Sequence, residues 1–304
     1  MTKRRRALAL AAALAMLASA GGVSWASSHT LPPPSALRQA GPQLGPQVAD
    51  IPAPEPRPAW REFMAYREGL RWFGGAALTL VVLLVLAHFA VHGSHHVRST
   101  GRPIRRYTMK EVLLHAALAL GFVGAWASST YLILAKYVLG GPASGAPVAL
   151  GRLSSTAHIA AGLVFFGALV GIAIVWRRSM RFAPYDPAWL RELGGYFTRG
   201  HRVLPAGRFN AGQKVWFYVS VLLGLLVAVT GALIYVPALF GPRASIVLYV
   251  AHTALAVAVS AAVIVHVYLS VLVHPCAVRA VLTGTIDEAC LREDHPLELE
   301  LTRR

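Results

Sequence analysis

The stretch VLYVAHTALAVAVSAAVIVHVYLSVL, residues 247–272, decides the fold of this chain. It contains no Asp, Glu, Lys or Arg, and it is long enough to cross a hydrocarbon core about 30 Å thick. It contains His252 and His266, whose spacing corresponds to roughly 21 Å along a helix and to directions within about 40° of each other. The stretch therefore predicts a transmembrane helix with two imidazoles on one side, near opposite membrane surfaces.

Two histidines at membrane depth have a plain structural explanation, because neighbouring polar groups inside a helix bundle can satisfy them. Polar side chains in a membrane are costly, however, and usually face the bundle interior with a partner or a task. A task that suits neutral imidazole is axial ligation of haem iron. Two haems need four such ligands, so this interpretation requires two further histidines at matching depths.

The composition is typical of a polytopic membrane protein, because 56% of the 304 residues are hydrophobic and only 14% are charged. The net charge of +16 comes from basic residues in loops between apolar runs, so membrane topology and anionic lipid explain it, and we expect no nucleic-acid partner. Cys276 and Cys290 are too few for an iron–sulfur cluster, and there is no C-x-x-C-H motif. Any haem would therefore be non-covalent and b-type.

The N-terminal region has two parts. Basic residues 3–6 precede a short apolar run, which predicts a signal peptide over residues 1–26, with an uncleaved extra helix as the alternative. Residues 27–72 are rich in Pro, Gly and Ala and predict a periplasmic linker followed by a pre-membrane segment.

Five apolar spans follow, and the absence of Asp, Glu, Lys and Arg from all of them argues against a carboxylate-based pump or ion transporter. The spans are residues 73–91, 112–135, 153–176, 215–236 and 247–272. We expect an all-α integral membrane protein with five transmembrane helices. Residues 73–91 would be an extra N-terminal helix, residues 105–280 a di-haem four-helix bundle, and residues 281–304 a cytoplasmic acidic tail.

The loops predict the orientation. Seventeen basic residues lie in the loops after the first, third and fifth spans, against three in the other two loops, namely Lys136, Arg152 and Arg243. The positive-inside rule then predicts an N-terminus on the outer side after signal cleavage and a cytoplasmic C-terminus. In a bacterial inner membrane, the outer side is the periplasm.

Two further histidines lie at the required depths. His115 is at the cytoplasmic start of the second span, and His158 is at the outer start of the third. Because the fifth span runs inward, His158 matches His252 near the outer surface, and His115 matches His266 near the inner one. These are the two bis-histidine levels that two b haems require.

Other features of the spans are weaker signals. Gly121, Gly124 and Gly162 would let a flat macrocycle approach the backbone, but helix packing uses small residues equally often. His88 and His92 could hold a metal ion, although an interfacial loop is the preferred interpretation. Three more histidines are expected on the cytoplasmic surface: His201, His274 and His295.

The loop that enters the fourth span, residues 205–214, has a structural and a functional interpretation. Asn210 and Gln213 have capping-box spacing, which alone would explain them. Free backbone N–H groups at the same helix start, with Gly212 allowing close approach, could also hydrogen-bond the carbonyl oxygen of a small molecule. A quinone bound there would lie beside the inner haem.

These residues resemble the gamma, or cytochrome b, subunit of membrane-bound formate dehydrogenases, in the longer branch with an N-terminal signal and an extra span. The resemblance covers about residues 105–296. It rests on RYTMKEVLLH (106–115), GRFNAGQK (207–214), VTG (229–231), the AH…HVY pattern (251–268) and VLTGTIDEAC (281–290). One departure is the C-terminus, where Glu293-Asp294-His295-Pro296 stands in place of a His-His-Pro segment rich in basic and aromatic residues.

The resemblance implies a membrane-anchoring electron-transfer subunit. It would take electrons from an iron–sulfur subunit, pass them through two b haems and reduce menaquinone or ubiquinone. Formate oxidation would belong to a separate molybdenum or tungsten subunit. The axial ligands would be the pairs His158/His252 and His115/His266, and Asn210, Gly212 and Gln213 would line the quinone site.

Two alternatives remain open from the sequence. One is the cytochrome b subunit of a related hydrogenase or thiosulfate reductase, which co-purifying subunits would identify. The other is a haem-free membrane transporter or assembly scaffold, which an optical spectrum would distinguish from a cytochrome.

Overall fold

The computed structural model describes residues 58–138, 146–198, 202–236 and 241–302. In these ranges five helices are long and apolar enough to cross a membrane. They are α3 (Pro58–His92), α4 (Met109–Val138), α5 (Ala146–Trp176), α7 (Ala211–Ile234) and α8 (Gly241–Val267), the last extended by a π-helical turn, η3 (Tyr268–Val273). The predicted signal peptide (1–26) and most of the predicted linker lie outside the described residues.

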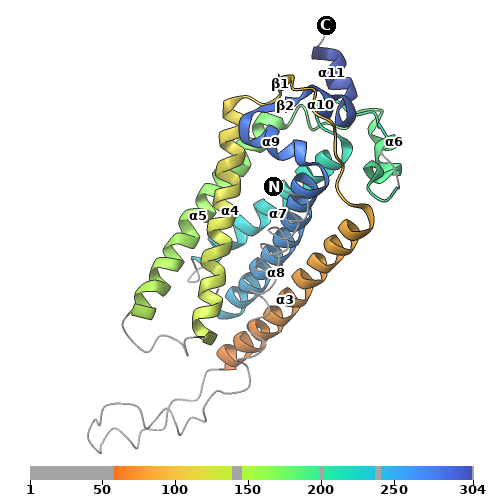
Figure 1. The fold of residues 1–304 in the computed structure, drawn as a ribbon. Coiled ribbons are helices and arrows are strands. Elements are labelled where there is room, and N and C mark those ends of the chain that lie inside the picture. Colours follow the sequence, from red (N-terminus) through yellow and green to blue (C-terminus); the bar gives the residue numbers. More distant parts are fainter. Residues whose placement is uncertain (1–57, 139–145, 199–201, 237–240, 303–304) are drawn as a thin grey trace, which may run out of the picture.

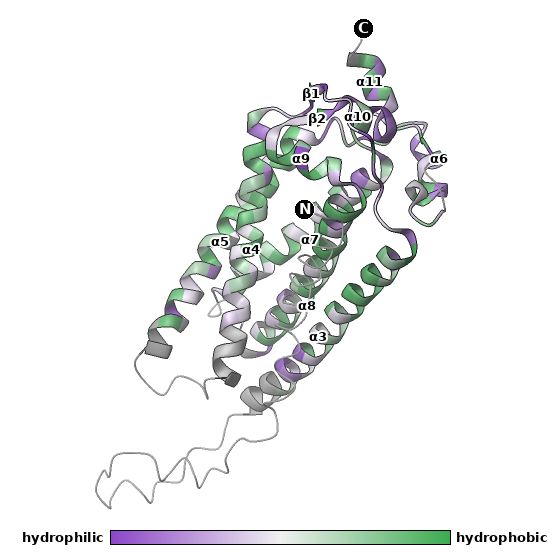
Figure 2. Ribbon diagram, in the orientation of Figure 1, coloured by the Kyte–Doolittle hydropathy of each residue, from purple (hydrophilic) through white to green (hydrophobic). Residues whose placement is uncertain are grey.

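The helices form one bundle. α4 lies along α5, α7 lies along α8, and α5 also contacts α7, while α3 packs against α8 (Figure 1). The predicted all-α integral membrane fold with five transmembrane helices is confirmed. Figure 2 shows the pattern expected of such a protein: hydrophobic residues cover the helices along the bundle, and hydrophilic residues gather at the end where α6, α10 and the two strands lie.

The first helix begins earlier than the predicted span. Its start at Pro58 falls inside the segment predicted as linker and pre-membrane residues. Proline suits the first turn of a helix, since its missing N–H has no intrahelical partner there. Glu68 pairs with Arg71 and accepts a hydrogen bond from Trp72 Nε1 at 3.0 Å. Such charges interrupt an apolar run without interrupting a helix, so hydropathy misses the first turns.

The hydrophilic end is a small folded structure, which we call the cap. It contains a two-stranded antiparallel sheet with Ile104 opposite Ile286 and several short helices (Figure 1). Its elements are β1 (Pro103–Arg105), α6 (Asp186–Arg191), η1 (Leu193–Gly195), α9 (Pro275–Thr283), β2 (Thr285–Asp287), α10 (Glu288–Asp294) and α11 (Pro296–Thr302). A buried cluster including Tyr107, Phe209 and Leu291 joins the cap to the bundle.

The segment predicted as an acidic tail is part of this cap. Asp287 accepts hydrogen bonds from the loop before β1, including Ser99 Oγ at 2.5 Å, and Glu298 lies 3.5 Å from Arg106. The surface position expected for His295 is wrong, because this side chain is only 2% exposed. The acidic residues around His295 predicted a solvent-exposed segment, but they pair with basic groups from other parts of the chain.

The cap also contains a disulfide. Cys276 at the start of α9 is bonded to Cys290 in α10. The bond closes a loop that contains β2, so it fixes α10 against the end of the last membrane helix.

Candidate functional site

The first histidine pair lies in the half of the bundle away from the cap. His158 comes from the first half of α5, and His252 comes from the first half of α8. Their ring centroids are 6.2 Å apart, with ring planes nearly perpendicular at 82°. The structure therefore brings these two predicted ligands together.

Each of these rings is oriented by a neighbouring helix. His158 Nδ1 lies 2.9 Å from the carbonyl oxygen of Ala125 in α4, and His252 Nδ1 lies 2.9 Å from that of Val227 in α7. A carbonyl oxygen can only accept, so Nδ1 must be the donor in both rings. Both Nε2 atoms then keep a lone pair, which is the arrangement of a metal-ligating histidine.

The second pair lies at the cap end. His115 in α4 and His266 near the end of α8 have ring centroids 6.4 Å apart. His266 also stacks on Trp216 of α7, with centroids 4.6 Å apart and planes only 6° from parallel. Trp216 is a site residue that the sequence analysis did not identify, although it lies close to the 205–214 loop.

Both separations fit an iron between two imidazoles. A metal–nitrogen bond is about 2 Å long, so two imidazoles that bind one metal must lie within a few ångströms of it, and ring centroids 6.2 Å and 6.4 Å apart allow this. In the part of the chain that the structure describes, no three His, Cys, Asp or Glu side chains gather as a protein-only metal site would need. A haem iron needs only two protein ligands.

The glycines differ in whether a side chain would fit in their place. A Cβ on Gly121 would lie 2.6 Å from the backbone nitrogen of Phe165, and one on Gly124 would lie 3.0 Å from Ala161 Cβ, so both permit close packing of α4 on α5. A Cβ on Gly162 would meet nothing within 4 Å. A Cβ on Gly231 would lie 3.0 Å from Cε1 of His252, so this glycine leaves space for the ring.

The 205–214 loop makes the predicted capping box. Gln213 N donates to Asn210 Oδ1 at 2.9 Å, and Asn210 N donates to Gln213 Oε1 at 3.0 Å. A Cβ on Gly212 would lie 2.4 Å from the Trp189 ring, so the indole covers this glycine. Asn210 also lines a small cavity of about 20 Å³ beneath the cap. The capping box thus accounts for the two polar side chains, and only Asn210 among the three borders this cavity.

A buried ion pair fixes the same helix start. Lys214 Nζ lies 2.7 Å from Asp186 Oδ2, and the two side chains are 3% and 1% exposed. Asp186 Oδ2 also accepts from the backbone N–H of Ala183. Breaking such a pair leaves an uncompensated buried charge, so it holds α6 firmly against α7. Lys214 lies just before the predicted fourth span and Asp186 ten residues after the third, and nothing in the sequence indicates that these two loop charges meet.

His295 forms a hydrogen bond with the 205–214 loop. Its Nδ1 lies 2.8 Å from the carbonyl oxygen of Gly207. Burial, reinforced by the positive charge of Arg106, lowers the pKa of His295 to about 3. The ring is therefore neutral at physiological pH, and its Nδ1–H donates to the loop.

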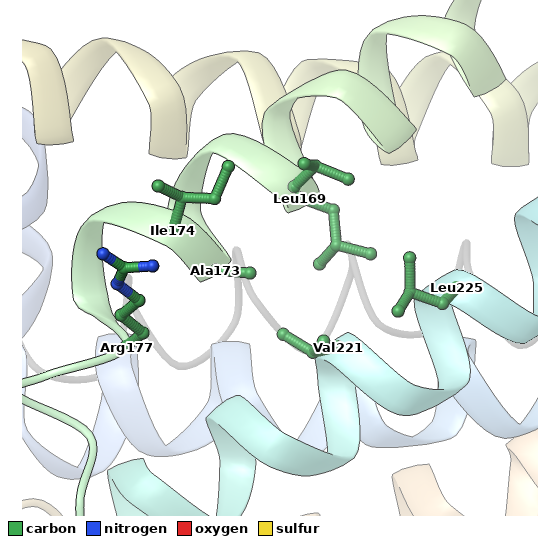
Figure 3. A pocket seen from close by; sticks show the side chains of 7 residues that line it. Leu169, Ala173, Ile174, Arg177, Val221 and Leu225 are labelled. Atoms are coloured by element: carbon green, nitrogen blue, oxygen red, sulfur yellow. The ribbon is translucent and has the colours of Figure 1, made fainter.

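A groove lies between α5 and α7 in the cap half of the bundle. Figure 3 shows its lining, with Leu169, Ala173 and Ile174 on α5 and Val221 and Leu225 on α7. Its volume is about 290 Å³, and Arg177 stands at one end. Carbon surface of this kind suits an acyl or isoprenoid chain in the membrane.

Comparison with known proteins agrees with this architecture. Residues 106–284 match the family of prokaryotic cytochrome b561. The formate dehydrogenase cytochrome b556(fdo) subunit of Escherichia coli K12 is 25% identical over 197 residues, which are 64% of this chain and 90% of that protein. The nitrate-inducible cytochrome b556(Fdn) subunit of the same organism is 25% identical over 143 residues, or 43% of this chain and 64% of that protein. The predicted resemblance to formate dehydrogenase cytochrome b subunits is confirmed.

Proposed function

The chain belongs to the prokaryotic cytochrome b561 family, and we propose that it is the membrane-anchoring electron-transfer subunit of a formate dehydrogenase complex. The observation that supports this most directly is that four histidines form two pairs in different halves of the bundle, with ring centroids 6.2 Å and 6.4 Å apart. The similar proteins that are named above are formate dehydrogenase subunits, which favours this donor over a hydrogenase or thiosulfate reductase.

In this proposal each pair holds one haem b. His158 and His252 are the ligands at the far end, and His115 and His266 are the ligands at the cap end. The bound haems supply the one-electron redox chemistry. The carbonyls of Ala125 and Val227 fix the ring orientation of His158 and His252.

Quinone is reduced at the cap end. Asn210, Gly212 and Gln213 lie at the start of α7, two turns or less from Trp216 and so near the His266 ring. Here menaquinone or ubiquinone would accept electrons, and Asn210, which borders the cavity beneath the cap, is the residue best placed to contact it. The apolar groove between α5 and α7 offers a surface for an isoprenoid tail.

The orientation follows from charge. The cap end is cytoplasmic in a bacterial inner membrane, because it collects the basic loops, and the far end faces the periplasm. The iron–sulfur subunit docks at the periplasmic end beside His158 and His252, and the molybdenum or tungsten subunit that oxidises formate binds beyond it. Residues 1–26 serve as signal peptide, and residues 105–280 form the haem-binding domain.

Measurement of haem content in the wild-type protein and in histidine variants tests the proposal. The purified protein should contain two b haems per chain by the pyridine haemochrome assay. His158→Ala and His252→Ala should each remove the same haem, and His115→Ala and His266→Ala the other. His96→Ala, an exposed histidine in the loop after α3, is the matched control and should retain both haems. One haem or none in the fully loaded protein, or a different grouping of the variants, would contradict the assignment.

A further inference from the structure

The cavity beneath the cap joins the proposed quinone site to a group of ionisable side chains. Asn210, Tyr196, His274, Glu293 and Asp294 all line it. Its volume of about 20 Å³ is enough for about one water molecule, and its walls offer that water several polar partners. Protons could therefore pass between these groups and Asn210 without crossing apolar space.

Four of the side chains form what we call the cap cluster: His95, His274, Glu293 and Asp294. His95 Nε2 lies 2.8 Å from Glu293 Oε2, and His274 Nδ1 lies 3.3 Å from Asp294 Oδ1. The two imidazole centroids are 5.6 Å apart. The cluster is thus two histidine–carboxylate pairs in contact with each other, contributed by the loop after α3, the end of η3 and α10.

Exposure decreases along the cluster. The side chain of Glu293 is 33% exposed and that of His95 20%, against 19% for His274 and 15% for Asp294.

The histidines that face Asp294 all lower the pKa of its carboxyl group. Burial alone would raise its pKa, but the hydrogen bond and charge of His274, with the charges of His295 and His95, hold the pKa of Asp294 below its ordinary value. The other polar groups bordering the cavity are Tyr196 and Arg202, and Arg202 is paired with Glu192 at 2.9 Å.

We propose that the cap cluster is the proton-delivery path to the quinone bound at Asn210. This inference rests on the proposed function. Reduction of a quinone to a quinol takes two electrons, which arrive through this subunit, and two protons, which must come from water at the same end. Glu293 and His95 take protons from solvent, His274 and Asp294 pass them on, and water in the cavity transfers them to the quinone oxygens.

Histidine is suited to this task because its ordinary pKa lies near the working pH, so it can both accept and release a proton. A purely structural role would need only hydrogen bonds and ion pairs that hold α10 against η3. The two roles differ in what they do to reactions that consume protons, and this difference can be measured.

The experiment follows haem reoxidation in the assembled complex after reduction by formate. The oxidant is either a short-chain quinone, which requires protons, or ferricyanide, which does not. His274→Gln and Asp294→Asn should slow reoxidation by quinone by about tenfold or more, since a positioned proton-transfer group contributes roughly 10²–10⁴-fold. The slowing should grow from pH 6 to pH 9, and reoxidation by ferricyanide should stay at the wild-type rate.

Matched variants complete the test. Asp294→Glu keeps a carboxylate and should retain most of the quinone rate, and His96→Gln changes the exposed histidine next to His95 and should match wild type. If the His274 and Asp294 variants do not accumulate, His95→Gln in the loop after α3 provides the same comparison. Wild-type quinone rates and pH profiles in the cluster variants would overturn the relay alone. A wild-type complex that is reoxidised by ferricyanide but not by quinone would overturn the proposed function and the relay together.

Discussion

His252 shows how much positioning a single imidazole receives in this bundle. The Val227 carbonyl and the Thr230 hydroxyl lie 2.9 Å and 3.2 Å from its Nδ1, and Gly231 leaves space beside the ring. All three come from adjacent turns of α7. One helix therefore sets the rotamer and the tautomer of a histidine on another.

Gly231 provides a prediction at the residue scale. A Cβ there would lie 3.0 Å from His252 Cε1, so Gly231→Val should push the ring away and remove the far-end haem selectively. Haem content by pyridine haemochrome should fall by about half. Gly167→Ala is the control, because a Cβ at Gly167 meets nothing within 4 Å. Full haem content in the Gly231→Val protein would mean that the ring has no such constraint.

The capping box at Asn210 gives a second prediction at this scale. Loss of a cap alone costs about 0.5–2 kcal/mol and would not affect electron transfer to quinone. If Asn210 contacts the quinone, Asn210→Ala and Gln213→Ala should keep both haems yet slow their reoxidation by limiting quinone in stopped-flow measurements. Thr108→Ala is the matched control, since Thr108 caps α4 at the same end of the bundle through Glu111. Equal rates in all three variants would leave only the capping role.

At the scale of elements, α10 and α11 depend on a neutral His295. The pKa of this buried ring is lowered from 6.5 to about 3, so the unfolded segment binds more protons than the folded one between these values. Stability of the cap should therefore fall as the pH drops below about 6.5, and above that pH this group has no effect. The loss at pH 5 should be about 2 kcal/mol.

Hydrogen exchange of the cap amides at pH 5 and pH 7 measures this loss, after correction for intrinsic exchange. His295→Asn retains a donor for the Gly207 carbonyl but does not titrate, and should remove most of the pH dependence. The same pH dependence in the variant would assign it to another group.

The disulfide gives the second prediction for the elements of the cap. It lies at the end proposed to be cytoplasmic, where thiols are normally kept reduced. Cys290 is only 3% exposed, so reductant should reach the bond slowly in native protein. We expect no maleimide labelling of native membranes treated with glutathione, and labelling of both cysteines after reduction in denaturant. Cys276→Ser should destabilise the cap by about 3 kcal/mol, given a closed loop of about 15 residues. Two reactive thiols in untreated native protein would contradict the pairing.

For the whole molecule, the basic cap end predicts the topology. Reporter fusions after Arg191 or Arg279 should report the cytoplasm, and fusions after Arg152 or Arg243 the periplasm. The bias is strong, with seventeen basic residues on one side against three on the other. Two or more reversed reporters would overturn the orientation, and with it the direction proposed for electron transfer.

The sequence by itself determined the membrane class, the number of spans and the histidine depths. Hydropathy is a sum over neighbouring residues, so a run such as 247–272 shows its environment without knowledge of the rest of the chain. Helical rise is regular, so residue number gives depth, and depth was enough to pair His115 with His266 and His158 with His252. The structure then places the rings of each pair 6.4 Å and 6.2 Å apart.

Only the tertiary structure decided the cap. Its contacts join residues far apart in the chain: His95 with Glu293, Arg106 with Glu298, and His295 with the Gly207 carbonyl. In the sequence these groups are indistinguishable from a solvated loop and an acidic tail, because whether a charge is exposed or paired depends on which segments meet in space. For the same reason the position of Trp216 against His266, and that of Gly231 beside His252, could not be derived from spacing within one helix.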